Sequence, residues 1–251
     1  MSVLALALLG IGVADLVRPR RWGNDSREVI VAVLAGLITL VALAVLADLT
    51  SGPDLLLLLA AGATLCGWVL TAAHSRTMPA SVPLSILASG IGVLVIGSGG
   101  ASGAGGDFAR WLNWTGLPGP QAEASPDTVL LVAGLLLIQV ATANTVVRLV
   151  LTQIGALGPV GSPQASDRLR GGRILGPMER VIILGLGLAG EVTAASLVIA
   201  AKGLIRWPEL RQSDLKDPDA IGVDEVTEYF LVGSMVSWTF ALLALAAARL
   251  L

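Results

Sequence analysis

The chain has 251 residues, of which 55% are hydrophobic and 14% are charged, and its formal net charge is −2. Soluble domains carry roughly 25% charged residues, so this composition predicts a protein embedded in a lipid bilayer. The nearly balanced charge supplies no basic surface for nucleic acid. A single cysteine and a single histidine exclude an intramolecular disulfide and metal sites built from several such residues. We therefore expect neither a metal nor another cofactor.

Seven apolar stretches approach the length of about 20 residues that a transmembrane helix needs. The expected spans are Val3–Val17, Val29–Ala47, Leu55–Ala73, Val82–Gly97, Val129–Leu151, Val181–Ala201 and Phe230–Ala248. The first lacks a positively charged start, which favours a span over a cleaved signal peptide. The first and fourth are short. They are either broken helices beside a transport site or, as we favour, inner helices packed through small residues. The sequence predicts an all-α polytopic bundle.

The distribution of Lys and Arg predicts the orientation of these spans. With the N-terminus outside, eleven basic residues fall on the inner side and five on the outer side. This asymmetry favours an outer N-terminus and an inner C-terminus. Four of the five outer basic residues lie in the connection from Lys202 to Tyr229, which is the weakest part of this topology. The Ala, Leu, Gly and Val-rich composition is typical of bacteria, so we expect a multi-pass protein of the bacterial cell membrane.

The chain is expected to form one membrane domain over residues 1–251. The first five spans occupy residues 1–151, a Gly/Pro-rich inner loop occupies 152–172, and a helical hairpin with charged flanks occupies 173–251. The long outer stretch Gly99–Thr128 carries Phe108, Trp111, Trp114 and Leu117. Tryptophan is enriched at the level of the lipid headgroups, so a short interfacial helix is expected there.

Glu191 is the most informative residue because it falls at the midpoint of the expected sixth span. A carboxylate at bilayer depth costs about 2.5 to 3.5 kcal/mol, so it should face the interior of the bundle. One interpretation is a proton or cation site, and the alternative is a buried carboxyl that ties helices together. Candidate partners are the polar residues of the fifth and seventh spans: Gln139, Thr142, Asn144, Thr145, Ser234, Ser237 and Thr239.

Two further patterns lie near Glu191. Gly185, Gly187 and Gly190 match a dinucleotide-binding fingerprint, but that motif requires a preceding strand, so helix packing is the favoured interpretation. Charged residues flank the last two spans and form a candidate charged hairpin: Glu179, Arg180, Lys202, Arg206, Glu209 and Glu228. Pairing of Lys202 or Arg206 with Glu228 would join these two spans at the membrane surface.

Three stretches of the C-terminal third combine charged and small residues: Gly172–Arg180, Ala200–Glu209 and Glu228–Ser237. With these stretches, about a third of the chain resembles a family of uncharacterised bacterial polytopic membrane proteins. The resemblance implies that the residues of the charged hairpin act together, and it implies no particular activity. Trp207 departs from the Phe common in the family, and Glu191 departs from an uncharged amide.

Two functions remain open. The first is a proton-linked or ion-linked transporter of a small solute, or a channel-like protein, centred on Glu191. The alternative is a non-catalytic structural subunit that binds other membrane proteins or a second copy of the chain. No cluster of metal ligands and no pair of facing aspartates is evident in the sequence. We therefore do not expect an enzyme.

Overall fold

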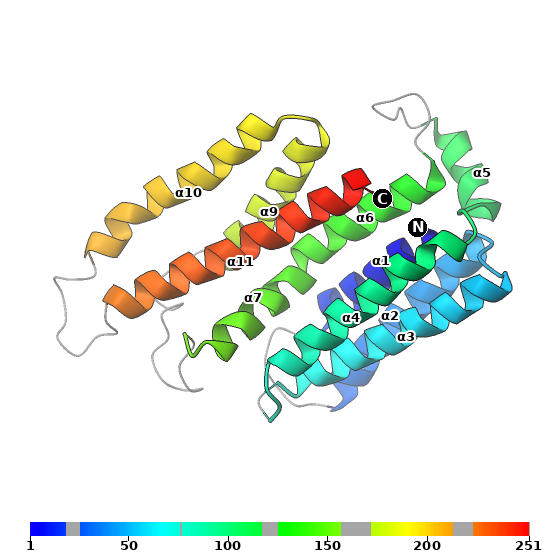
Figure 1. Cartoon of the computed structure of the whole chain (residues 1–251), viewed down its shortest axis with the longest axis horizontal. Helices are drawn as coiled ribbons and strands as arrows, with labels where there is room; N and C mark the ends of the chain where they lie inside the picture. Colours follow the sequence, from blue (N-terminus) through cyan, green and yellow to red (C-terminus); the bar gives the residue numbers. More distant parts are fainter. Residues whose placement is uncertain (19–25, 76, 117–124, 157–171, 213–222, 251) are drawn as a thin grey trace. The chain divides into compact units, whose positions relative to one another are not determined.

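The computed structural model describes residues 1–18, 26–75, 77–116, 125–156, 172–212 and 223–250. Across those residues every regular element is a helix (Figure 1). The chain divides into two compact units, residues 1–142 and 143–250, which are described separately. The prediction of an all-helical protein is confirmed.

The first unit is built around its N-terminal helix. Its elements are α1 (Ser2–Val17), α2 (Ser26–Leu46), α3 (Gly52–Ala73), α4 (Ser81–Gly97), the short η1 (Ser98–Gly100), α5 (Gly106–Thr115) and α6 (Pro126–Val140). Helix α1 packs against α2, α3 and α6, and its side chains from Val3 to Leu8 are buried. The short first stretch is therefore a packed inner helix, as favoured from its sequence.

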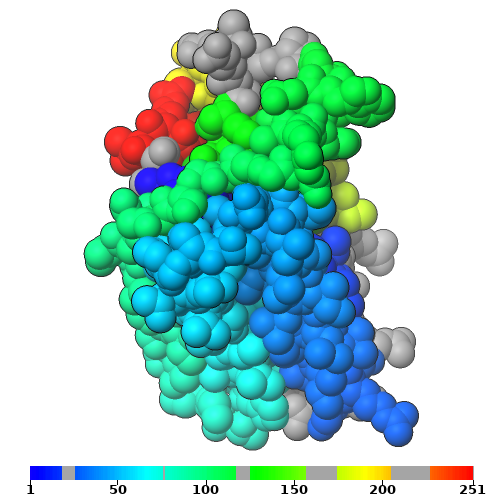
Figure 2. Space-filling view, turned by 90° about the vertical axis from the view of Figure 1, so that its right-hand side faces the viewer, coloured from blue at the N-terminus to red at the C-terminus, as the bar shows by residue number. Residues whose placement is uncertain are grey.

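Small residues allow α1 and α2 to approach closely. A Cβ atom added to Gly36 would lie 2.8 Å from the carbonyl oxygen of Gly10, which is closer than two such atoms can pack. The opposite surface of α2 carries large exposed apolar side chains, including Ile30, Ile38 and Val45. This surface and that of α3 are visible in blue to light blue in Figure 2. Apolar residues exposed along a whole helix are suited to contact with lipid.

Two carboxylates hold the connection before α5 against the ends of the helices. Asp54 forms a capping box with Ser51 and accepts a hydrogen bond from the backbone N–H of Ser102 at 2.8 Å. Asp127 accepts hydrogen bonds from the backbone N–H of Ala104, at 3.0 Å, and from the hydroxyl of Ser2. These bonds satisfy partly buried backbone donors and the buried hydroxyl of Ser2, which would be costly to leave unpaired.

Helix lengths and hydropathy identify the elements able to cross a membrane. In the described residues four helices are long and apolar enough, namely α2, α3, α4 extended through Gly100, and the Thr227–Leu250 part of α11 (Val223–Leu250). A fifth candidate is the pair formed by α6 and α7 (Thr142–Gln153), which bends by 46° at Ala141. Helix α1 and the stretch Val192–Leu204 are apolar but shorter. The apolar helices indicate a membrane-embedded bundle.

The second unit contains α7 from Ala143 onward, α9 (Gly172–Leu188), α10 (Val192–Gln212) and α11. Helix α9 packs against both α10 and α11. The apolar core of this unit includes Ile183 from α9, Ala195 from α10, and Ala241 with Trp238 from α11. The unit is thus a small helical bundle in which each of these three helices contributes to one core.

The expected sixth span Val181–Ala201 is wrong as a continuous helix. It comprises the end of α9, a turn, and the start of α10. Gly190 has φ +87°, the left-handed conformation that ends many helices. The N–H of Gly190 bonds the carbonyl of Gly187, and the N–H of Glu191 bonds that of Leu186, which together form a Schellman motif. The chain therefore reverses at Gly190.

This turn also corrects the expected position of Glu191. The residue lies outside both helices, its side chain is exposed, and its carbonyl accepts the first backbone hydrogen bond of α10 from Ala195. Glu191 is therefore the N-cap of α10 and is not sheltered in the middle of a span. Gly187 does allow close helix packing, because a Cβ there would overlap the side chain of Leu245.

The short helix expected in the stretch Gly99–Thr128 is present as α5. Its rings of Phe108 and Trp111 lie 5.9 Å apart, and Trp111 and Trp114 are exposed. Glycine in the left-handed conformation at Gly116 ends the helix. Three of the four residues that predicted an interfacial helix lie on α5, namely Phe108, Trp111 and Trp114, whereas Leu117 lies outside the described residues.

Candidate functional site

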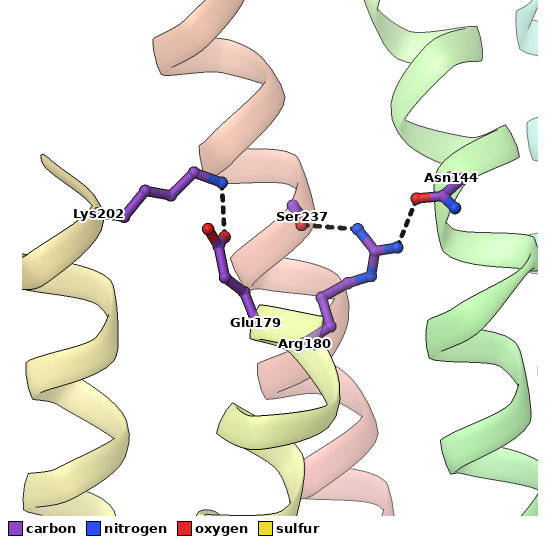
Figure 3. A network of polar contacts seen from close by, with 5 residues as sticks. All are labelled: Asn144, Glu179, Arg180, Lys202 and Ser237. Atoms are coloured by element: carbon purple, nitrogen blue, oxygen red, sulfur yellow. Dashed lines mark hydrogen bonds and ion pairs between the residues drawn. The ribbon is translucent and has the colours of Figure 1, made fainter. Parts of the chain in front are cut away.

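A network of polar side chains runs through the second unit and links four helices. It contains Asn144 on α7, Glu179 and Arg180 on α9, Lys202 on α10 and Ser237 on α11 (Figure 3). All five residues are among the candidates from the sequence. Glu179, Arg180 and Lys202 belong to the charged hairpin, and Asn144 and Ser237 were expected to be partners of Glu191. The Lys202–Glu179 ion pair and the bonds of Arg180 to Ser237 and Asn144 are joined because Glu179 and Arg180 are adjacent residues of α9.

Glu179 and Lys202 form an ion pair between α9 and α10. The distance from Nζ to Oε2 is 2.6 Å, and the two side chains are only 16% and 15% exposed. The ammonium group of Lys202 also lies 5.9 Å from the ring centre of Phe230 and 5.7 Å from that of Trp238. Such cation–π contacts stabilise a charge that is largely removed from water. Lys202 is thus held by a carboxylate and by two aromatic rings of α11.

Arg180 is 2% exposed and connects α9 with α7 and α11. Its Nη1 donates a hydrogen bond to Oγ of Ser237 at 2.8 Å, and its Nη2 donates one to Oδ1 of Asn144 at 2.6 Å. Hydrogen bonds from a charged donor are shorter and stronger than neutral ones. Arginine is always protonated in proteins, so this guanidinium brings a permanent positive charge into the bundle.

Adjacent residues of α9 reach different neighbours because of helix geometry. Successive residues of an α-helix are rotated by about 100° around its axis. Glu179 therefore faces α10, whereas Arg180 faces α7 and α11, as Figure 3 shows. The Glu179-Arg180 pair places one negative and one positive charge on two contact surfaces of the same helix.

The network offers charged hydrogen-bond donors and an acceptor in a region of low dielectric constant. There, interactions with a polar or charged ligand are stronger than in water. Binding of a small polar solute, or passage of an ion, is the chemistry that these groups support.

The predicted partnerships of the charged hairpin are only partly observed. Lys202 pairs with Glu179 and not with Glu228, whose side chain is exposed. The side chains of Arg206 and Glu209 lie outside the described residues, so their predicted pairing stays a prediction. The structure brings Glu179, Arg180 and Lys202 into one network and leaves Glu228 at the surface.

The candidate polar stripe of the fifth span is divided by the bend at Ala141. Gln139 lies near the end of α6 and Thr142 is the first residue of α7, and both are buried within the first unit. Asn144 joins the network of the second unit, and Thr145 is half-buried there. The three-residue spacing of Gln139, Thr142 and Thr145 predicted a continuous helix face, which a 46° bend interrupts.

The first unit also contains a buried charged residue, Asp15, which has a structural role. Asp15 accepts a hydrogen bond at 2.9 Å from the indole N–H of Trp68, which is fully buried on α3, and lies 3.3 Å from the guanidinium of Arg18. The pairing of Asp15 with Arg18 follows from their three-residue spacing on a helix. Trp68 could not be identified from the sequence, because its contact with Asp15 spans 53 residues.

Asp54 and Asp127 were also missed by the sequence analysis. Each follows a serine and stands in the first turn of a helix, with proline near the start. This pattern is a recognised N-terminal helix signal and could have identified both caps.

Comparison of the chain with protein-family models, with curated proteins and with solved structures found no match.

Proposed function

We propose that this chain is a multi-pass protein of a bacterial cell membrane that allows a small polar solute or ion to cross, using the Glu179–Arg180–Lys202 network as its polar site. The observation that carries the proposal is the buried guanidinium of Arg180, held by uncharged oxygens from two other helices beside an ion pair. The proposed partners are the lipid bilayer and other membrane proteins or a second copy of the chain.

The energetic cost of the network supports a functional role. A charged side chain at bilayer depth costs about 2.5 to 3.5 kcal/mol on insertion scales. Tying helices together does not require charges, because well-packed apolar side chains stabilise a bundle as well as a buried ion pair or better. Binding of a polar solute or an ion would account for the retention of three charged side chains in one bundle.

The bend between α6 and α7 is a second supporting feature. A helix broken at membrane depth frees backbone groups that can coordinate a solute, and such breaks are common in transporters. Here the 46° bend at Ala141 separates two apolar helices, and buried Gln139 precedes it by two residues. An interrupted span carrying buried polar side chains is typical of a transport protein.

Light scattering by proteoliposomes tests the proposal. Vesicles containing the purified protein are challenged with potassium chloride, potassium nitrate, glycerol or glycine, and their volume recovery is compared with that of empty vesicles. We expect faster recovery with at least one of these solutes, and at least a tenfold loss of that gain in Arg180→Met. The matched control Arg110→Met changes an exposed arginine of α5 and should keep the wild-type rate.

Two results would contradict the proposal. In one, none of the four solutes enters faster than in empty vesicles. In the other, Arg180→Met elutes as a folded protein and retains the full rate. The second result would instead indicate that Arg180 only ties α7, α9 and α11 together, as expected for a structural subunit of a membrane assembly.

A further inference from the structure

The turn at Gly190 changes the path of the chain through the membrane. Three side-chain contacts define the directions of the helices in the second unit. Glu179 meets Lys202 although they lie on opposite sides of the turn, so α9 and α10 are antiparallel. Arg180 bonds Ser237, and further along Arg249 donates a hydrogen bond at 2.7 Å to the carbonyl oxygen of Gly187, so α9 and α11 run in the same direction.

We infer that the α9–α10 hairpin enters and leaves the membrane on the same side. The connection between α10 and α11 then lies on the same side as the connection between α7 and α9. Because α11 is long and apolar enough to cross once, its C-terminal end lies on the opposite side. This arrangement replaces the inner C-terminus expected from seven alternating spans.

The inference does not depend on how deeply the hairpin inserts. Helix α9 has 17 residues and α10 has 21, which correspond to about 25 Å and 31 Å at 1.5 Å per residue, against about 30 Å of hydrocarbon. Two complete crossings, a re-entrant hairpin and a hairpin lying on the surface all return the chain to its starting side. An odd number of crossings would require a continuous helix through residue 190.

The positions of the basic residues support the hairpin. In the second unit, the connections that the hairpin places on one side, with the adjoining helix ends, contain Arg148, Arg168, Arg170, Arg173, Arg206, Arg211 and Lys216. The other side has Arg249, while Arg180 and Lys202 lie within the hairpin. With Arg180 and Lys202 left out in the same way, a continuous sixth span would divide the remaining eight basic residues five to three. Seven against one is the asymmetry typical of a cytoplasmic and an external side.

The first unit, considered by itself, has a matching asymmetry. If its spans alternate, the connections after α1 and after α3 carry Arg18, Arg20, Arg21 and Arg76, with Arg27 in the first turn of α2. The other side has Arg110. In the seven-span topology, the connection after Lys202 placed several basic residues on the outer side. The hairpin places that connection on the cytoplasmic side, so this exception to the positive-inside rule disappears.

Cysteine labelling tests the inference on the complete chain. In a Cys66→Ala background, single cysteines are introduced by Ser162→Cys, Ser213→Cys and Leu250→Cys. A membrane-impermeant maleimide is applied to intact cells and to inverted membrane vesicles. We expect Ser162→Cys and Ser213→Cys to react only in inverted vesicles and Leu250→Cys only in intact cells. Labelling in detergent confirms that each thiol can react.

The inference is overturned if Ser162→Cys and Ser213→Cys react from opposite sides. That result would require an odd number of membrane crossings between these two residues. It is also overturned if Ser213→Cys and Leu250→Cys react from the same side. Asp217→Cys provides a second reporter for the α10–α11 connection if Ser213→Cys does not elute as a folded protein. The labelling does not use transport activity, so its outcome is independent of the proposed solute.

Discussion

Replacing Lys202 with methionine leaves the Glu179 carboxylate without its cation in the interior of the second unit. At the observed 2.6 Å, two unit charges attract each other by about 6 kcal/mol at an effective dielectric constant of 20. Desolvation of the two groups offsets most of this attraction. Removal of one partner is nevertheless expensive, about 3 to 5 kcal/mol, because the other charge stays buried and unpaired. Loss of the contacts with Phe230 and Trp238 adds about 0.5 to 1 kcal/mol.

The double variant Glu179→Gln/Lys202→Met separates the pair from its individual residues. With both charges absent, we expect a loss of less than about 1 kcal/mol relative to wild type. The free energy of unfolding is measured by far-UV circular dichroism in mixed micelles with increasing denaturing detergent. As a control, Arg110→Met breaks the exposed ion pair with Asp107 and should cost less than about 1 kcal/mol. If the double variant loses the sum of the two single losses, the two charges do not act as a buried pair.

The same unfolding assay tests two other features. Gly190→Ala places a side chain at φ +87° and should lower stability by about 1 to 2 kcal/mol, whereas Gly185→Ala, at an open position inside α9, should raise it by about 0.5 to 1 kcal/mol. Equal effects at both glycines would argue against the turn. Trp68→Phe removes the hydrogen bond to buried Asp15 and should cost about 1 to 3 kcal/mol, while Trp114→Phe, at a residue 83% exposed, should change stability by less than about 0.5 kcal/mol. If Trp68→Phe leaves the free energy of unfolding unchanged, the indole N–H does not stabilise the carboxylate.

Hydropathy predicted the long helices well because each is one uninterrupted apolar run. The expected spans Val29–Ala47 and Leu55–Ala73 differ from α2 and α3 by at most three residues at either end. A helix of this length in lipid must satisfy its backbone groups internally, which leaves few other conformations. The bend at Ala141 cannot be predicted from hydropathy, because an apolar run with small residues has the same mean hydropathy whether it is straight or bent.

The sixth span was predicted wrongly because two signals at one position were interpreted separately. Gly190 was assigned to helix packing, and Glu191 was interpreted as a buried charge. Together, glycine after an apolar helix and a polar residue before the next one form an ordinary helix stop and start. The surrounding Leu, Ile, Val and Ala residues obscured this signal, since both arms of the hairpin are apolar. A carboxylate in the middle of a long apolar run can therefore indicate a turn as well as a buried site.

The ion pair itself reports the position of the turn. Glu179 and Lys202 are 23 residues apart in the sequence, a separation of about 35 Å along a continuous helix. Such a helix would place them near opposite surfaces of the membrane, as flanking charges. In an antiparallel hairpin, two residues meet when they are about equally far from the turn, and Gly190 lies eleven residues after Glu179 and twelve before Lys202. The contact at 2.6 Å therefore requires a reversal near residue 190. The exchange Glu179→Lys/Lys202→Glu should therefore be more stable than either single exchange, because it restores an opposite-charge pair at this contact. A double exchange that loses the sum of the two single losses would contradict the reversal.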